Sequence, residues 1–178
     1  DDRDALARMA AGAAGSDLLL TTGGASVGDH DLVAPVLEAR GLSLDFWKIA
    51  MRPGKPLMFG RLGRQRVLGL PGNPVSSLIC TRVFVVPLIE RLLGRLDAPQ
   101  PIMTARLAHP LPANEIRQHY MRAIVKTGAD GRLSVSTVRS QDSSLLSPLA
   151  QSTGLIVRPP RAPALPAGAE ISVLPLDF

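Results

Sequence analysis

The first half of the chain alternates helical patterns with short apolar runs. Residues 1–15 (DDRDALARMAAGAAG) carry acids at the start and glycines at the close, which predicts an amphipathic helix. Residues 16–22 (SDLLLTT) form a continuous apolar run, typical of a strand covered on both faces. Residues 30–41 (HDLVAPVLEARG) predict a second helix that ends at Gly41, with Pro35 in its first turn.

The next segments continue this alternation. Residues 42–51 (LSLDFWKIAM) predict a strand with Leu42, Leu44, Phe46, Lys48 and Ala50 on one face. Residues 56–70 predict two short strands around a glycine-containing turn. Residues 73–94 predict a long apolar helix, which Asn73 or a neighbour caps, with Pro74 in the first turn and Gly94 after its end. Alternating elements of this kind predict an α/β layered sheet.

The pattern changes at residues 97–101, where we place a boundary between domains of residues 1–97 and 98–178. Prolines become frequent, and the segment GADGR (128–132) predicts a hairpin turn. The remaining strand-like segments are IMTARLA, YMRAIVK, LSVSTV, GLIVRP and EISVLPL. Five short strands with turns between them predict a small β-barrel or sandwich.

Composition limits the class of protein. The 178 residues suffice for one large or two small domains, and with aromatics at only 3% the core must consist of Leu, Val, Ile and Ala. No apolar run reaches the roughly 18 residues of a membrane span, and no segment resembles a signal peptide. The single cysteine, Cys80, cannot form an internal disulfide, so we expect a reducing cytoplasm. Since the sequence begins at Asp1 and not at Met, we expect a piece of a longer protein.

Charge favours an anionic ligand without identifying it. Twenty Lys and Arg against fifteen Asp and Glu leave a net charge of +5. The arginines are scattered, without a dense basic tract or interleaved aromatics, so nucleic acid is not an expected partner.

The loop TTGGASVGDHD (21–31) follows a predicted strand and precedes a predicted helix. A glycine-rich connection at the carboxyl end of a strand lets backbone N–H groups approach an anion or a planar ring, and the helix N-terminus adds partial positive charge. Asp29 and Asp31 can hold Mg²⁺ or accept hydrogen bonds from a heterocycle. The alternative is a tight turn in which one of these carboxylates caps the next helix.

Two further loops carry related chemistry. In KIAMRPGKP, Lys48 and Arg52 are four residues apart, a spacing that places both on one face of a strand, and Lys55 follows the Pro-Gly turn. These cations form a candidate anion clamp, the alternative being solvated surface charges. In LPGNPVSS, residues 71–76 join a strand to an apolar helix and present free N–H groups and the Ser76 hydroxyl, the alternative being a well-capped helix start.

In this order and spacing, TTGGASVGDHD, MRPGKP and LPGNPVSS resemble the molybdopterin molybdenumtransferase family, which includes MoeA and the C-terminal region of gephyrin. The resemblance extends over the whole chain. It implies the C-terminal half of a three-layer α/β/α molybdopterin-binding domain, followed by a small C-terminal β-barrel domain. It also implies a reaction in which adenylated molybdopterin and molybdate give molybdenum cofactor and AMP, with Mg²⁺ assisting.

The resemblance also implies site residues. Asp31, Lys48 and Arg52 match catalytic positions, Asp31 as the metal ligand; the family commonly has Lys where Arg52 stands, and Arg keeps the charge. The ligand-binding residues it implies are Asp1, Gly23, Gly24, Ser26, Gly28, Asp29, Gly54, Lys55, Pro71, Gly72, Asn73, Pro74, Ser76 and Ser143. Asp142 replaces the glycine that usually precedes this serine.

Family members carry an upstream half of the α/β domain and two further N-terminal domains. Without those strands we expect the sheet to expose an edge or an apolar face, and the chain alone not to be a competent enzyme. The resemblance implies a cytoplasmic homodimer in the full-length protein, and a molybdopterin adenylyltransferase as a possible partner; neither nucleic acid nor a membrane is expected. The alternatives are an adenylyltransferase-type relative and a non-catalytic scaffold module.

The other chemically distinctive side chains are expected to be structural. His30, His109 and His119 lack metal-ligand spacing and are expected at the surface. Cys80 is expected in the core and Trp47 beneath a helix.

Overall fold

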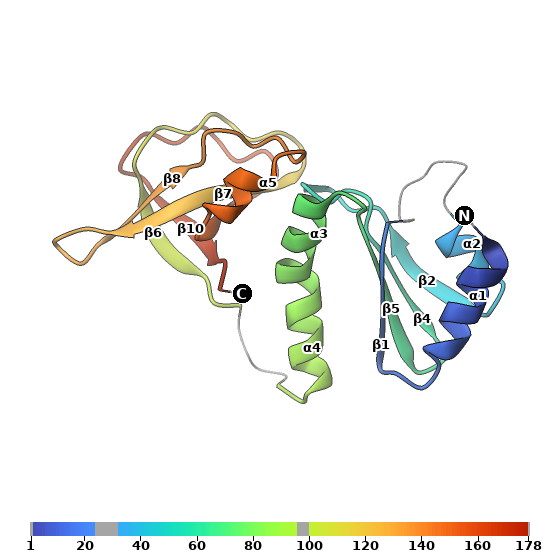
Figure 1. The fold of residues 1–178 in the computed structure, drawn as a ribbon. Helices are drawn as coiled ribbons and strands as arrows, with labels where there is room; N and C mark the ends of the chain where they lie inside the picture. The colour runs from blue at the N-terminus through green and yellow to red at the C-terminus, as the bar shows by residue number, and fades with distance from the viewer. Residues whose placement is uncertain (1, 24–31, 96–99, 178) are drawn as a thin grey trace. The chain divides into compact units, whose positions relative to one another are not determined.

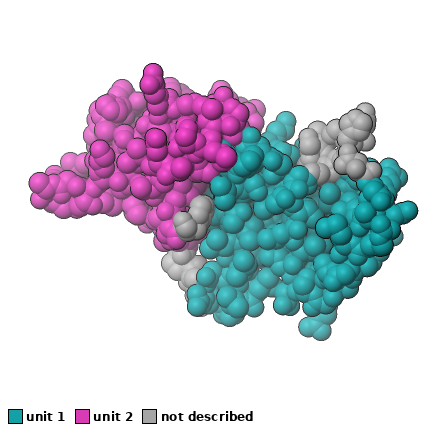
Figure 2. Space-filling model, in the orientation of Figure 1, with its two compact units in different colours: residues 1–49, 54–96 teal, residues 50–53, 97–178 magenta. Residues whose placement is uncertain are grey.

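The computed structural model describes residues 2–23, 32–95 and 100–177. The chain divides into two compact units, Asp1–Ile49 with Gly54–Leu96 and Ala50–Pro53 with Asp97–Phe178 (Figure 2). Residues 50–53 therefore leave the first unit and take part in the second.

A mixed four-stranded sheet forms the centre of the first unit. Its strands in spatial order are β1 (Leu18–Thr22), β5 (Gln65–Leu70), β4 (Met58–Leu62) and β2 (Leu42–Trp47). β1 runs parallel to β5, whereas the β4–β5 and β2–β4 pairs are antiparallel. The predicted glycine-containing turn is confirmed between β4 and β5, where Gly63 has a φ of 62°.

Helices cover both faces of this sheet (Figure 1). α1 (Arg3–Gly12) and α2 (Val33–Glu38) lie on one face, and their buried side chains join those of the sheet in one cluster. The cluster contains Ala10, Ala34, Leu37, Leu42, Met58 and Val67. A long helix lies on the opposite face; it consists of α3 (Pro74–Cys80), η1 (Thr81–Val85) and α4 (Val86–Leu92). The predicted α/β layering is therefore confirmed.

Local chemistry accounts for the helix ends. The Asp2 carboxylate accepts hydrogen bonds from the N–H groups of Asp4 and Ala5 at 2.9 and 3.2 Å, which begins α1. Gly94, with a φ of 82°, follows the long helix as predicted. Pro87 lies at the start of α4 and cannot donate to the carbonyl one turn earlier, which explains the wider π turn of η1 before it.

β1 differs from the fully covered strand that its apolar run predicts. β1 lies at one edge of the described sheet, and Leu20 is 42% exposed. The expectation of an exposed sheet edge is therefore confirmed for the residues that the structure describes.

β2 also differs from its prediction. It ends at Trp47, and its register with β4 shifts between Leu44 and Phe46. Because a bulge reverses the alternation, Trp47 packs against the core cluster while Phe46 is exposed and lies against Phe59, with ring centroids 5.7 Å apart. Lys48 then takes a φ of 76°. The predicted single face through Leu42, Leu44, Phe46, Lys48 and Ala50 was wrong.

The second unit is a closed β-barrel with one additional short strand. The strand order is β3-β7-β8-β6-β10-β9, and a further β7–β9 pairing closes five of the strands. The elements are β3 (Met51–Arg52), β6 (Met103–Leu107), β7 (Gln118–Thr127), β8 (Leu133–Thr137), α5 (Leu146–Ala150), β9 (Gly154–Arg158) and β10 (Glu170–Pro175). All five strand-like segments of the sequence form strands, and the turn at Gly131, with a φ of 74°, joins β7 to β8 as predicted.

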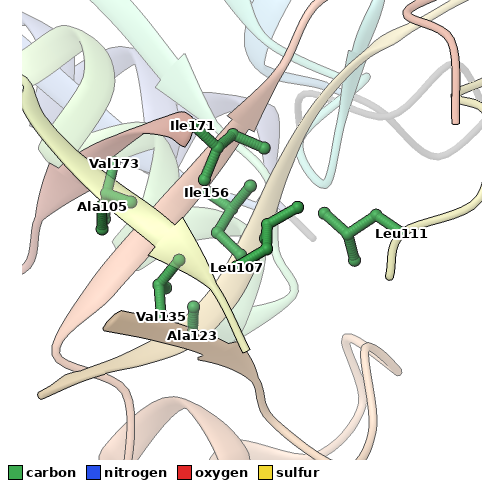
Figure 3. Packing of buried hydrophobic residues seen from close by; sticks show 8 residues of the cluster. All are labelled: Ala105, Leu107, Leu111, Ala123, Val135, Ile156, Ile171 and Val173. Carbon is green, nitrogen blue, oxygen red and sulfur yellow. The ribbon is translucent and has the colours of Figure 1, made fainter. Parts of the chain in front are cut away.

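The barrel interior is filled by small and branched aliphatic side chains (Figure 3). The cluster consists of Ala105, Leu107, Leu111, Ala123, Val135, Ile156, Ile171 and Val173. Among the described residues, no helix combines the length and the apolar character needed to cross a membrane.

The bulge in β2 predicts a glycine requirement in the neighbouring strand. A Cβ on Gly60 would lie 2.5 Å from the Ser43 carbonyl oxygen, which is backbone and cannot rotate away. We expect Gly60→Ala to lower the free energy of unfolding by about 1–3 kcal/mol, measured by hydrogen exchange in the first unit. Gly12 in α1 has open space around the same position, so Gly12→Ala should stabilise by about 0.5–1 kcal/mol. Equal effects of the two substitutions would contradict this packing.

Candidate functional site

Two of the predicted loops meet at the edge of the first sheet. β1 and β5 are parallel neighbours, so their carboxyl ends lie together. The N–H of Gly23 donates to the Leu70 carbonyl at 3.1 Å, and a Cβ on Gly72 would lie 3.4 Å from the Gly23 Cα. Gly23 has a φ of 78°, a backbone conformation that residues other than glycine rarely adopt. The structure therefore brings the start of the glycine-rich loop against residues 71–73.

The start of α3 is both capped and open to a ligand. The Asn73 Oδ1 accepts the Ser76 N–H at 3.0 Å, so Asn73 is the helix cap, and Ser76 is buried. Pro71 is buried and Pro74 occupies the first helical turn, where no N–H is needed. The N–H groups of Gly72 and Asn73 donate to no residue that the structure describes. These two donors can bind an anion at the end of the sheet.

The cap gives a prediction of its own. We expect Asn73→Ala to lower the free energy of unfolding by about 1 kcal/mol, because the Ser76 N–H loses its acceptor. Thermal denaturation of the whole chain measures the loss. Asn73→Asp keeps an accepting oxygen and should remain close to the parent, whereas an equal loss in both variants would show that the cap bond is not the cause.

The segment of residues 48–57 forms a loop closed by backbone hydrogen bonds. The Lys48 N–H donates to the Leu57 carbonyl at 2.9 Å, and the Ile49 N–H donates to the Lys55 carbonyl at 3.0 Å. Gly54 is buried with a φ of 103°, which positions the turn before Lys55. The backbones of Lys48 and Lys55 therefore lie close together in the first unit, and both residues are exposed.

Arg52 belongs to the second unit and not to the strand that precedes Lys48. It lies in β3, which pairs with β7 of the barrel, so the predicted common strand face of Lys48 and Arg52 was wrong. The Arg52 guanidinium is 47% exposed and lies 3.7 Å from the Glu115 carboxylate. A role for either cation in binding an oxyanion stays a prediction.

Ser143 lies in a barrel loop that a buried arginine holds in place. Arg122 is 1% exposed, and its guanidinium donates to the carbonyl oxygens of Ser140, Asp142 and Leu145 at 3.2, 2.9 and 3.0 Å. Gln141 exchanges two further hydrogen bonds with the Arg122 backbone. Sequence reasoning missed Arg122, although an arginine inside the apolar segment YMRAIVK was a usable signal.

Asp142 also orders this loop. Its carboxylate accepts the Ser144 N–H at 2.9 Å, and the hydrogen bonds from Ser144 lower the pKa of Asp142 below its ordinary value. The aspartate at the usual glycine position is thus compatible with an ordered turn beside Ser143.

Several predicted site residues lie outside the described residues. They are Asp1, Gly24, Ser26, Gly28, Asp29 and Asp31, together with His30. Within the described ranges, no three His, Cys, Asp or Glu side chains come close enough to hold a metal ion. The fit of Mg²⁺ to this chain therefore depends on residues that the structure does not describe.

A hollow of about 620 Å³ lies between α1, α2 and β1. Apolar side chains such as Leu6, Leu19 and Leu37 line most of it, and Thr21, Thr22 and Gly23 line it where β1 ends. The Thr21 hydroxyl is buried and has no hydrogen-bond partner among the described residues. Apolar walls with a few polar groups are typical of sites for ring-containing ligands.

For the side chains expected to be structural, most predictions are confirmed and one was wrong. Cys80 is fully buried, and burial raises the pKa of its thiol to about 12, so it is an inert core residue as predicted. Trp47 packs against the core cluster that α1 and α2 share with the sheet, and His109 is exposed, both as predicted. The expectation that His119 is a surface residue was wrong, because it is half-buried at the start of β7.

Comparison with known proteins identifies the first unit. Residues 1–91 match the family described as the probable molybdopterin binding domain. The chain belongs to this family. After the molybdopterin-binding domain, residues 104–176 match the MoeA C-terminal region, domain IV.

Similar proteins extend well beyond this chain. A molybdopterin molybdenumtransferase of Haemophilus influenzae is 35% identical over 163 residues, which cover 91% of this chain and 40% of that protein. One from Bacillus subtilis is 31% identical, covering 89% of this chain and 36% of that protein. The molybdopterin biosynthesis MoeA protein of Pyrococcus horikosii has a similar structure, with a TM-score of 0.76 at 27% identity over 100% of this chain and 42% of that one. The chain therefore spans less than half the length of these relatives.

Proposed function

We propose that this chain is the C-terminal portion of a molybdopterin molybdenumtransferase, with residues 1–97 and 98–178 as its two domains. The complete protein would convert adenylated molybdopterin and molybdate into molybdenum cofactor and AMP. The observation that carries the proposal is the succession of two family matches in one chain, a molybdopterin-binding domain followed by a MoeA C-terminal region. The similarity to the relatives named for this transferase extends over 89–91% of this chain and so includes both matched regions.

The first unit supplies the binding chemistry. The N–H groups of Gly72 and Asn73, which donate to none of the described residues, support binding of a phosphate group, since backbone donors at a helix start attract anions. The hollow beside Thr21 and Gly23 offers apolar walls for a heterocycle. Lys48 and Lys55, which the closed loop brings together, add positive charge for molybdate or phosphate.

Arg52 and Ser143 would act from the second unit. Arg52 offers a planar fork of donors to an oxyanion, and Ser143 lies on the loop that Arg122 holds. Mg²⁺ at Asp31 would neutralise phosphate charge when bound. We also propose that the full-length protein is a cytoplasmic homodimer that receives its substrate from a molybdopterin adenylyltransferase.

Release of AMP tests the function. The complete protein, given adenylated molybdopterin, should release AMP at a rate that rises with molybdate concentration and then saturates. An adenylyltransferase-type relative would instead adenylate molybdopterin from ATP, and a scaffold module would do neither. Either of those results would contradict the proposal.

A further inference from the structure

A group of basic side chains gathers where the barrel interior ends. Along β7, Met121, Ala123 and Val125 face the interior, so His119 continues the same row toward the barrel end. His119 is the register partner of Arg158 in β9 and of Arg52 in β3. Arg117 lies two residues before His119. We call Arg52, Arg117 and His119 the basic cluster.

Hydrogen bonds fix the cluster's surroundings. The Asn114 amide donates to the carbonyl oxygens of Arg117 and Arg158 at 2.9 and 3.1 Å, which holds the turn before β7 against the end of β9. Arg158 is 3% exposed, and its guanidinium donates to the Pro112 and Pro163 carbonyls at 3.0 and 2.6 Å. Since carbonyl oxygens carry no net charge, they satisfy this guanidinium without neutralising it.

The charge in this region is mostly positive. Burial, together with the positive charges of Arg52, Arg117 and Arg122, lowers the pKa of His119 to about 4, whereas Glu115 acts to raise it. Glu115 is also the carboxylate beside Arg52, at 3.7 Å, and both side chains of this pair are largely exposed. Arg117 pairs with no carboxylate among the described residues. An exposed pair of this length contributes little stability, so an anion can displace Glu115.

We propose that the basic cluster binds a tetrahedral oxyanion, with the Arg52 and Arg117 guanidinium groups and the His119 imidazole as donors and Glu115 as the internal competitor for Arg52. Two guanidinium groups supply planar pairs of donors for such an oxyanion. The inference deepens the proposed function, on which it rests for the source of the anion: molybdate itself or the phosphate of the adenylated substrate.

Titration of His119 by NMR tests the proposal with the whole chain. The imidazole titration is followed in sulfate and in chloride at matched ionic strength. A bound dianion near the ring favours its protonated form, so the pKa of His119 should rise by about one unit in sulfate. His109 is exposed outside the cluster, and its resonances serve as the internal control for general effects of the salts. Equal titration of His119 in both salts would overturn the proposal.

Matched variants separate a site from general charge effects. Glu115→Gln removes the competitor and should tighten sulfate binding by about two- to five-fold. Asp130→Asn removes a carboxylate that also lies 3.7 Å from an exposed guanidinium, that of Arg132, and should leave sulfate binding unchanged. The double substitution of Arg52 and Arg117 by Gln should abolish the sulfate effect on His119. Equal effects of Glu115→Gln and Asp130→Asn, or persistence in the double variant, would contradict a defined site.

The source of the anion is then assigned at neutral pH. Molybdate and AMP are added separately, and the shift of the His119 resonances is recorded. A response to molybdate alone assigns the cluster to the metal oxyanion. A response to AMP alone assigns it to the phosphate and would contradict binding of that phosphate by Gly72 and Asn73. A response to neither overturns the proposal. Failure of AMP release by the complete protein would refute the proposed function without changing this titration, so the two can fail separately.

Discussion

Replacing Arg122 with alanine is expected to lower the free energy of unfolding of the barrel unit by about 3–5 kcal/mol. The guanidinium is 1% exposed and donates to three carbonyl oxygens of residues 140–145. Its removal leaves those acceptors without their donor and opens a cavity beneath the loop, and both effects destabilise. Hydrogen exchange at the amides of β7 measures the loss in the second unit by itself.

Two further substitutions distinguish the shape of Arg122 from its charge. Arg122→Lys keeps the charge but cannot reach three carbonyls with a planar fork, so we expect most of the loss to remain. Arg132, which is exposed in the β7–β8 hairpin, provides the control, and Arg132→Ala should change stability by no more than about 0.5 kcal/mol. A small effect of Arg122→Ala would show that the loop carrying Ser143 is held by other contacts.

Replacing Asp31 with asparagine is expected to reduce AMP release by the complete protein at least about 100-fold while leaving the fold intact. The substitution is informative because asparagine caps a helix about as well as aspartate, so a capping role survives it. A role that needs the negative charge, such as holding Mg²⁺, does not survive. The measurement is the rate of AMP release at saturating molybdate, together with the thermal unfolding curve.

A control for this substitution is available in the same unit. Asp17 is exposed just before β1, so Asp17→Asn changes the net charge equally and should leave AMP release unchanged. Normal turnover of the Asp31→Asn protein would place Asp31 in the capping role.

Elements defined by local chemistry could be predicted from the sequence. Asp2 and Asn73 begin their helices with side-chain hydrogen bonds to residues two or three positions away, and Gly63 and Gly131 sit at positive φ in two-strand turns. These features depend on neighbours within a few residues, so the pattern alone determines them. The strands of the barrel were recognisable for the same reason.

Features that depend on distant partners could not be predicted in this way. Residues 51–52 pair with residues 118–119, and the bulge in β2 depends on its register with β4. Their alternation therefore suggested one continuous strand and a common face for Lys48 and Arg52. The role of Arg122 arises from a loop some twenty residues away, and the half-burial of His119 from the strands on either side. In the candidate site, Gly23 contacts Gly72. This contact brings together the glycine-rich loop and the loop before α3, which are far apart in the sequence.

The most direct test is a crystal structure of the complete protein with AMP and molybdate bound. We expect the phosphate of AMP within hydrogen-bond distance of the Gly72 or Asn73 N–H, at the shared carboxyl ends of β1 and β5. AMP bound elsewhere in the protein, or bound with its phosphate away from residues 71–73, would contradict this placement of the substrate.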